Sequence, residues 1–242
     1  MKYVGSKNRL AKELAPIIQS YITDETEGYL EPFVGGANMI DKIKCKNKTG
    51  SDIHKELIAL LSYVKFNSDK LPSGISREEY VKVRDNKEDY PEWYVGLVGF
   101  CGSYNAKYFG GYAGQCKTKE GIRHYDQEAI RNLKKQSKDI QGIEFVHMSF
   151  FDYDPSKIRN RVIYCDIPYK NTTDYDTEQF PYDEFYSWCV EVSKNNTVLI
   201  SEYWMPEDKF ECIWEKQHKT SLDKNNNQKA RIEKLFTVRK DV

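Results

Sequence analysis

Short apolar segments alternate with helical patterns along much of the chain, and this alternation limits the possible folds more than any other feature. Residues 29–34, YLEPFV, are an apolar run that ends at two glycines, and a second brief run closes at Ser51 and Asp52. Residues 53–66 then carry apolar side chains at helical spacing. Elements in this order are parallel strands joined by crossover helices. The sequence therefore predicts an α/β fold.

The same reasoning predicts further elements on either side. Ser6 is a favourable N-cap for a helix whose apolar positions recur at helical spacing, namely Leu10, Leu14, Ile17 and Ile18. Helices are also predicted in the Lys-rich stretch between Gly36 and Ser51 and across residues 181–193. The predicted strands of the second half are residues 143–148, 161–167, 197–203 and 232–238.

Residues 67–142 interrupt the alternation. Within them, residues 99–116 contain five Gly and five Phe or Tyr, a composition that neither a helix nor a regular strand explains. Residues 117–138 follow with seven Lys or Arg. We therefore predict one sheet built from residues 1–66 and 143–242, with residues 67–142 inserted between its halves.

The charges balance overall but are unevenly distributed. Thirty-seven Lys and Arg stand against 37 Asp and Glu. Residues 1–12 nevertheless carry four basic side chains and no acid, and residues 216–240 carry eight basic side chains, whereas residues 152–191 carry nine acids against four basic side chains. A neutral protein can bind a polyanion when its basic residues share one face, although any single Lys-rich run is more often a solvated surface.

Three other features exclude whole classes of protein. No apolar run approaches the roughly 20 residues that span a bilayer, and no apolar stretch follows the basic N-terminal residues as in a secretory signal. The six Cys include no C-x-x-C pair, which argues against structural zinc and a dense disulfide framework. We therefore expect a cytoplasmic protein with reduced thiols, no metal and no membrane partner.

Two strand ends carry the residue types of a chemical site. Gly35 and Gly36 follow the first strand, where a glycine turn lets a ligand approach the backbone, and Asp52 ends the next strand, where an acid can accept hydrogen bonds from ribose hydroxyls. Asp166-Ile167-Pro168-Tyr169 closes a later strand. There a carboxylate and a backbone carbonyl can accept the two N–H groups of a planar amine, and a ring can stack on it. Each pattern alone is also compatible with an ordinary turn.

Taken in order, these elements resemble a Dam-like DNA adenine-N6 methyltransferase of the alpha-ordered group, of the phage and bacterial type. Tyr3–Lys7 resembles the family's aromatic-x-Gly-x-Lys element, and Glu31–Asn38 its E-P-F-x-G-x-G cofactor motif. Asp52 matches the ribose-binding acid, and Asp166–Tyr169 the catalytic D-P-P-Y tetrapeptide. Other segments that follow the family are Thr172, Thr173, Tyr175 to Phe185, Ser201-Glu202-Tyr203 and Glu233–Phe236.

The resemblance implies a Rossmann-like S-adenosylmethionine-dependent methyltransferase sheet with an inserted, mostly helical target-recognition segment. The implied catalytic residues are Asp166, Ile167, Pro168 and Tyr169. The implied cofactor-binding residues are Tyr3, Lys7, Phe33, Gly35, Gly36, Asp52, Phe150 and Asp166. Two departures stand out. Ala37 replaces the last Gly of the cofactor motif, and Ile167 replaces the first Pro of the tetrapeptide but keeps its carbonyl.

The resemblance also implies transfer of a methyl group to the exocyclic amine of adenine in duplex DNA after base flipping, with S-adenosylhomocysteine as product. Candidate DNA-binding residues are Tyr104, Asn105, Lys107, Arg123 and Lys134. We expect a monomer or a weak dimer in a bacterial or phage-infected cell. The alternatives are a methyltransferase of RNA or of a protein amide, which would not need the basic insertion, and a non-catalytic DNA-binding relative, which would not need the strand-end acids.

Overall fold

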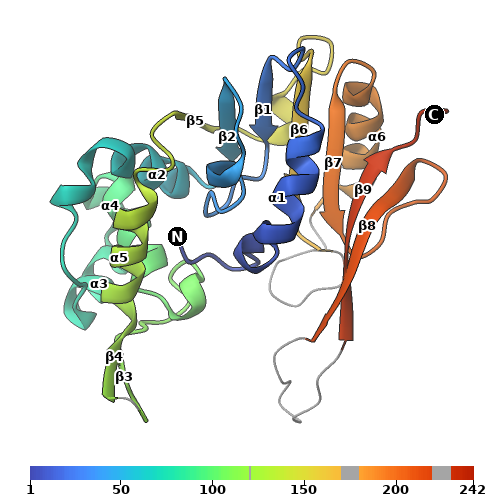
Figure 1. Ribbon diagram of the computed structural model, residues 1–242. Helices are drawn as coiled ribbons and strands as arrows, with labels where there is room; N and C mark the ends of the chain where they lie inside the picture. Colours follow the sequence, from blue (N-terminus) through green and yellow to red (C-terminus); the bar gives the residue numbers. More distant parts are fainter. Residues whose placement is uncertain (120, 170–179, 220–229) are drawn as a thin grey trace.

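The computed structural model describes residues 1–119, 121–169, 180–219 and 230–242. Across these ranges the main sheet has seven strands in the order β5-β2-β1-β6-β7-β9-β8 (Figure 1). The strands are β1 Gly28–Glu31, β2 Lys48–Asp52, β5 Ile143–His147, β6 Arg161–Asp166, β7 Thr197–Glu202, β8 Phe210–Lys219 and β9 Ala230–Val238. The first five in this order are parallel, and β9 is antiparallel to both of its neighbours. The predicted α/β sheet is confirmed.

Helices cover both faces of this sheet. In Figure 1, α1 (Ala11–Ser20) lies in front of the strands and α6 (Tyr182–Ser193) lies behind them. Successive residues of a strand point to opposite faces, so Tyr29 joins the core beneath α1 while Leu30 joins the core beneath α6. Helix α1 buries Leu14 and Ile18, which are one turn apart. Each face therefore has its own apolar core, as in a fold with helices on both sides of a parallel sheet.

The inserted residues 67–142 form a group of helices beside the β5 edge of the sheet (Figure 1). Their elements are α3 Arg77–Asp85, α4 Glu92–Gly96, the π-helix η5 Leu97–Cys101, a hairpin of β3 Gln115–Thr118 and β4 Gly121–His124, and α5 Tyr125–Gln136. No described residue of the insertion pairs with the seven-stranded sheet. The insertion still shares a core with α2 (Lys55–Asn67): a Cβ added at Gly96 would lie 2.2 Å from the Glu56 carbonyl oxygen, so α2 and α4 are in close contact.

One predicted helix is absent. The Lys-rich stretch after the glycine turn forms only the 3₁₀ turn η2 (Ile40–Lys42) and then runs extended toward β2. The side chain of Gln19, on α1, accepts from the Lys44 amide (2.8 Å) and donates to the Lys44 carbonyl (3.0 Å). Because these bonds satisfy backbone groups that a helix would pair internally, the chain is held extended here. The glycine turn consequently has no helix N-terminus behind it.

The remaining differences concern boundaries and short elements. Ser6 caps the 3₁₀ turn η1 (Lys7–Arg9) rather than α1, and residues 99–101 belong to the π-helix although their composition argued against any helix. The edge strand β8 and the β3–β4 hairpin were not predicted. The other short helical turns are η3 Ser68–Lys70, η4 Lys87–Asp89, η6 Tyr104–Ala106 and η7 Phe150–Asp152. The motif residues Thr172, Thr173 and Tyr175 lie outside the described residues.

Candidate functional site

A large cavity lies where the parallel strands end. Strands β2, β1, β6 and β7 all terminate at one edge of the sheet, and the cavity there has a volume of about 1720 Å³. Its walls include the strand ends, residues 1–10, residues 149–151, the loop that follows η5 in the insertion, and one side of helix α5, Gln136 among them. Ligands of open parallel sheets bind at this edge. Asp52 and Asp166, which end β2 and β6, both line the cavity.

The turn after β1 is shaped for close backbone approach. Gly35 has φ +47°, and a Cβ there would lie 2.9 Å from Cε1 of Tyr3. A Cβ on Gly36 would lie 2.7 Å from Cβ of the same tyrosine. Ala37 also adopts a positive φ, +55°, although it carries a side chain, and it is fully buried. The motif departure at Ala37 is therefore accommodated in a left-handed conformation that only glycine adopts without strain.

Asp52 is bonded to this turn. Its Oδ2 accepts from the Gly35 amide at 3.1 Å, and its Oδ1 accepts from the His54 amide at 3.0 Å. Burial raises the pKa of Asp52, while the bonds from the His54 and Gly35 amides oppose that rise. Each carboxylate oxygen can still accept a second hydrogen bond, so Asp52 can receive a pair of adjacent hydroxyls.

Aromatic side chains line the same part of the cavity. Phe33 packs against Phe150 at 5.5 Å between ring centroids, and Phe150 is only 3% exposed because Phe185 and Trp188 cover it as well. Phe150 is thus a core residue that reaches the cavity wall. Its neighbour Phe151 stacks on it and is 53% exposed, so it presents more free surface to a planar ring. Ile53, directly after Asp52, is another exposed apolar residue of the wall, at 72%.

A buried charge cluster occupies the cavity floor. The Lys7 ammonium lies 2.7 Å from Asp166 Oδ1 and 3.3 Å from Glu233 Oε1, and it sits 4.3 Å from the centroid of the Tyr169 ring. The Tyr169 hydroxyl donates to the same Glu233 oxygen. Three side chains, Asp166, Tyr169 and Glu233, are therefore joined around the Lys7 cation.

The electrostatics of this cluster leave Asp166 less acidic than usual. Burial is the largest cause that raises the pKa of Asp166, Glu233 raises it further, and Lys7 opposes both. Burial alone would lower the pKa of Lys7, but Asp166 and Glu233 together raise it. A cation between two carboxylates is consistent with Lys7 remaining charged although its side chain is 9% exposed. The Asp166 side chain, 23% exposed, still reaches the cavity.

The rest of the tetrapeptide is held tightly. Ile167 and Pro168 line the cavity, and the Tyr182 hydroxyl donates to the Pro168 carbonyl at 2.9 Å. Tyr169 is only 8% exposed, since Lys7 lies over its ring and Tyr203 meets it at 4.5 Å between centroids. Stacking of Tyr169 on a base therefore requires these contacts to loosen, and this role stays a prediction.

The predicted DNA-binding residues lie in two places. Tyr104 and Asn105 stand together on a loop beside the cavity, and Tyr104 is 62% exposed, so it is not a core aromatic. The loop is anchored from below: the buried Tyr80 hydroxyl bonds Ser103 Oγ at 2.9 Å, and the Tyr104 amide donates to the Gly111 carbonyl at 2.8 Å. Most other aromatics of residues 99–116, such as Phe109, pack inside the insertion.

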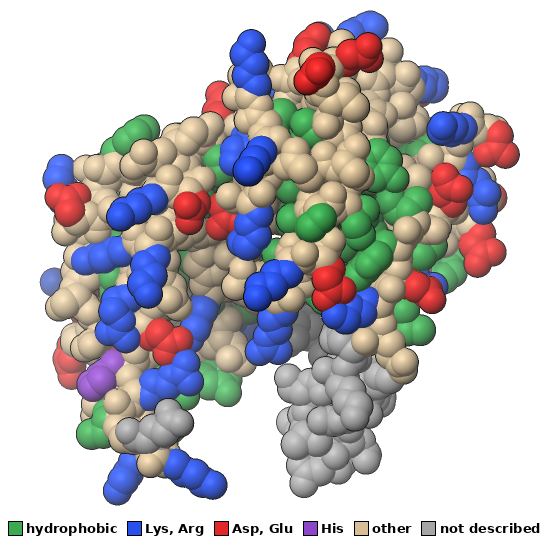
Figure 2. Space-filling view, in the orientation of Figure 1, with side chains coloured by type: hydrophobic (Ala, Val, Ile, Leu, Met, Phe, Trp, Pro, Cys, Tyr) green, Lys and Arg blue, Asp and Glu red, His purple; other side chains and the backbone are tan. Residues whose placement is uncertain are grey.

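The three basic candidates differ in their surroundings. Lys107 is exposed near the Tyr104 loop, and Arg123 is half-exposed on the hairpin, where it pairs with Glu128 at 2.6 Å. Lys134 donates to the Leu71 carbonyl at 2.9 Å, a bond that a phosphate contact would have to replace. In Figure 2, blue side chains gather along α5 and at the tip of the β3–β4 hairpin, on the same side as the hollow next to the sheet. Their contact with DNA stays a prediction.

Three residues of the site were missed from the sequence alone. Glu233 was noted only as part of a C-terminal motif, and its place in the Lys7 cluster follows from the pairing of β9 with β7. Glu31, 2% exposed, accepts from the Tyr29 hydroxyl at 2.7 Å, and burial raises its pKa well above the ordinary value. Gln136, on α5, bonds the backbone of the glycine turn across 100 residues of sequence. No local pattern marks these contacts.

The fold and the site together define a methyltransferase: a parallel sheet with a glycine turn and two strand-end acids around one cavity. A family model described as D12 class N6 adenine-specific DNA methyltransferase matches residues 3–223. The chain belongs to this family, and it is an adenine-specific DNA methyltransferase by membership. No curated protein sequence matches it significantly.

Two solved structures resemble the chain more remotely. The crystal structure of the 23S rRNA methyltransferase ErmE aligns with 11% identity and a TM-score of 0.36, over 95% of this chain and 68% of that one. The structure of SMU.472, described as a methyltransferase and complexed with SAH, aligns with 13% identity and a TM-score of 0.39, over 96% of this chain and 52% of that one. Similarities this low identify neither a substrate nor a partner.

Two kinds of feature are absent from the residues that the structure describes. None of the helices in these ranges is both long and apolar enough to cross a membrane. The same ranges contain no group of three or more His, Cys, Asp or Glu side chains arranged to hold a metal ion.

Proposed function

We propose that the chain transfers a methyl group from S-adenosylmethionine to the exocyclic amine of adenine in duplex DNA, after the adenine has been flipped into the cavity. One observation carries this proposal: the glycine turn with Asp52 and the tetrapeptide with Asp166 end neighbouring strands of the sheet and line the same cavity. A donor bound at the first and an amine bound at the second would be adjacent.

The residues around the turn fit the cofactor. Asp52, bonded to the Gly35 amide, can accept hydrogen bonds from two ribose hydroxyls. Phe33, Phe151 and Ile53 offer apolar surface to an adenine ring. When bound, the cofactor would supply an electrophilic methyl group on a sulfonium. Tyr3 packs on the turn and lines the cavity, so it can contact the same ligand.

The tetrapeptide fits a poor nucleophile that needs polarisation. The amino nitrogen of adenine shares its lone pair with the ring, and positive charge grows on this nitrogen during methylation. Asp166 and the Ile167 carbonyl can accept its two hydrogens and stabilise that charge. Lys7 occupies Asp166 Oδ1, which leaves Oδ2 for the amine. Lys7 therefore keeps Asp166 ionised and oriented.

The insertion supplies surfaces that suit DNA. An exposed tyrosine on an anchored loop beside the cavity can enter a duplex, at a cost of a few kcal/mol for unstacking the target. Exposed cations such as Lys107 and Arg123 can neutralise phosphates. These are the expected parts of a target-recognition segment, residues 67–142, attached to a catalytic domain of residues 1–66 and 143–242.

A transfer assay with labelled cofactor tests the proposal. Wild-type protein should label adenine in duplex DNA, and Asp166→Ala should lower kcat by about 100-fold or more, a far larger effect than its weakening of cofactor binding. Asp154→Ala is a matched control, because this acid is exposed and pairs only with surface groups. Labelling of RNA or of protein in place of DNA would favour an alternative substrate. Near-normal turnover of Asp166→Ala would refute the catalytic assignment.

A further inference from the structure

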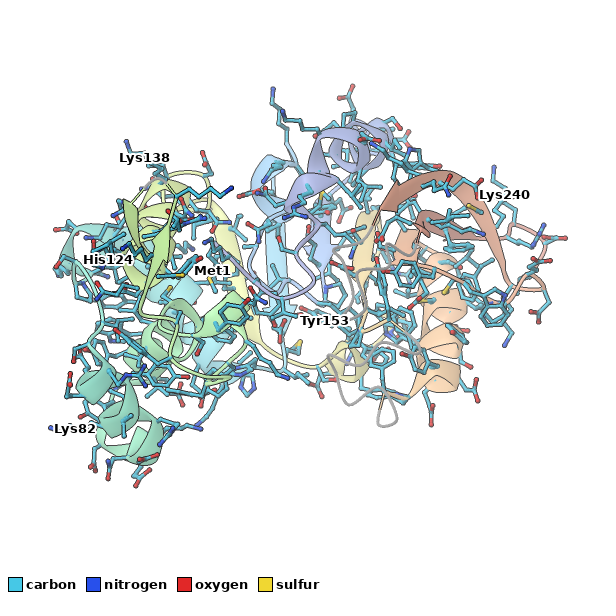
Figure 3. The ribbon with its side chains drawn as sticks, turned by 90° about the horizontal axis from the view of Figure 1, so that it is seen from below. Met1, Lys82, His124, Lys138, Tyr153 and Lys240 are labelled. Carbon is cyan, nitrogen blue, oxygen red and sulfur yellow. The ribbon has the colours of Figure 1, made fainter. Side chains whose placement is uncertain are left out.

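Helix α5 of the insertion ends at a buried side-chain amide, that of Gln136, which reaches the glycine turn after β1. Gln136, the last residue of α5, is 7% exposed. Its Nε2 lies 3.1 Å from the Gly36 carbonyl oxygen, 2.9 Å from that of Ala37 and 3.0 Å from Asp41 Oδ2. Its Oε1 accepts from the backbone amine of Met1, which lies between the insertion and the sheet (Figure 3). Gln136 is therefore bonded on both sides of its amide.

These bonds fall on the part of the turn that is strained. Ala37 has φ +55° and is fully buried, and its amide donates to the Val34 carbonyl at 2.9 Å. A residue with a Cβ loses free energy in this conformation, so something must hold it there. The turn has no helix behind it to fix its geometry, because only the 3₁₀ turn η2 follows. The Gln136 amide bonds both the Gly36 and the Ala37 carbonyls, and the N-terminal amine of Met1 adds a longer bond, 3.3 Å, to the Gly36 carbonyl alone.

We infer that Gln136 is a positioning residue of the methyltransferase: it acts through the backbone of the turn, which it holds at Gly36 and Ala37 in the conformation that receives the cofactor. This inference rests on the proposed use of S-adenosylmethionine. Only molecules whose turn has this conformation bind the cofactor. The apparent dissociation constant for S-adenosylmethionine therefore rises as the fraction of such molecules falls. Loss of the bonds at Gln136 should therefore weaken cofactor binding.

The test compares S-adenosylmethionine binding by calorimetry in matched variants. Gln136→Met keeps a similar volume and removes the amide, and it should weaken binding about tenfold, the range for losing a buried hydrogen bond or two. Gln136→Glu should also weaken binding: its carboxylate keeps the contact with the Met1 amine, but it has no N–H for the two carbonyls and would lie against Asp41. Arg131→Ala, at an exposed position of the same helix, is the control and should bind as wild type does.

Rescue separates positioning from a merely structural role. Glycine adopts a positive φ without strain, so Ala37→Gly should need less support from Gln136. In the Gln136→Met background, Ala37→Gly should restore most of the lost affinity, and the gain in affinity should be larger there than when Ala37→Gly is made in the wild-type protein. If Gln136→Met destabilises α5, the variant Gln136→Asn offers a milder change, and its deficit should also be rescued by Ala37→Gly.

The outcomes distinguish this inference from the proposed function. Normal affinity in Gln136→Met, or a deficit that Ala37→Gly leaves untouched, would refute the positioning role while the proposed function stands. Failure of the wild-type protein to bind S-adenosylmethionine would refute the proposed function, and the inference with it.

Discussion

Replacing Lys7 by Met removes the one cation of the charge cluster and provides the sharpest test of how the site is built. Lys7 lies 2.7 Å from Asp166 and 3.3 Å from Glu233. At an effective dielectric constant of about 20, these distances correspond to about 6 and about 5 kcal/mol of attraction before the cost of desolvation is subtracted. Removing one partner of such a buried group leaves uncompensated charge, which typically costs about 3–5 kcal/mol. Lys7→Met should be destabilised by that amount at neutral pH.

The same substitution should move the pH dependence in a defined direction. The pKa of Asp166 is already raised, and Lys7 is the charge that restrains it, so the pKa of Asp166 rises further in Lys7→Met. Glu233, Glu31, Tyr164 and Tyr169 also face this carboxyl, and none supplies a positive charge. Because the proposed reaction needs an ionised Asp166, the acidic limb of kcat/KM should shift to higher pH in Lys7→Met.

The stability of Lys7→Met relative to the wild type should fall as the pH rises, whereas its kcat/KM should rise with pH along the acidic limb. A carboxyl whose folded pKa lies above its unfolded value contributes stability below the unfolded pKa, and that contribution is lost as the pH rises through the folded pKa. The loss of stability in Lys7→Met should therefore be smallest near the ordinary carboxyl pKa of about 4 and should grow as the pH rises, measured by urea unfolding. Lys157→Met, at a largely exposed lysine, is the control. An unchanged acidic limb together with a pH-independent deficit would refute the cluster as the determinant of Asp166 ionisation.

Three other predictions concern the cofactor and the DNA. Asp52→Asn should weaken S-adenosylmethionine binding about tenfold or more by calorimetry, because its charged acceptor is lost, and should leave DNA affinity unchanged; equal cofactor affinity would make Asp52 a turn residue only. Tyr104→Ala should reduce the fluorescence of 2-aminopurine placed at the target, since the exposed ring no longer enters the duplex, and unchanged fluorescence would exclude it from flipping. Arg123→Ala should weaken binding to all duplexes alike and flatten the salt dependence by about one unit; an unchanged slope would mean that Arg123 only pairs with Glu128.

The sheet could be predicted because its strands are short, apolar and separated by helical patterns. β6 and β7 are buried on both faces and read as continuous apolar runs. Strand β8 lies at the sheet edge, where exposed polar residues such as Glu211 leave no such run. The prediction of a helix after Gly36 was wrong for a different reason. The backbone groups of Lys44 bond the side chain of Gln19, which lies on another element, and not other residues of a helix.

The site could be predicted as far as its motifs are local. The glycine turn and the two acids stand at strand ends, and parallel strands bring their carboxyl ends to one edge. Glu233 and Gln136 act on residues more than 60 positions away, and their contacts depend on which strand pairs with β7 and on where α5 ends. Such contacts are fixed by tertiary packing, which one sequence does not encode in any local pattern.

Helix α5 connects two places that differ in chemistry. It spans 12 residues, about 18 Å, and begins directly after the cationic hairpin. Its last residue, Gln136, bonds the glycine turn after β1. If a duplex bound at the hairpin favours one position of this helix over another, it also changes the conformations open to the turn at the other end. Thermodynamic linkage makes such an effect mutual. If a duplex bound at the hairpin raises the affinity for the methyl donor by some factor, the donor raises the affinity for the duplex by the same factor. The enzyme would then assemble both reactants together more readily than either one alone.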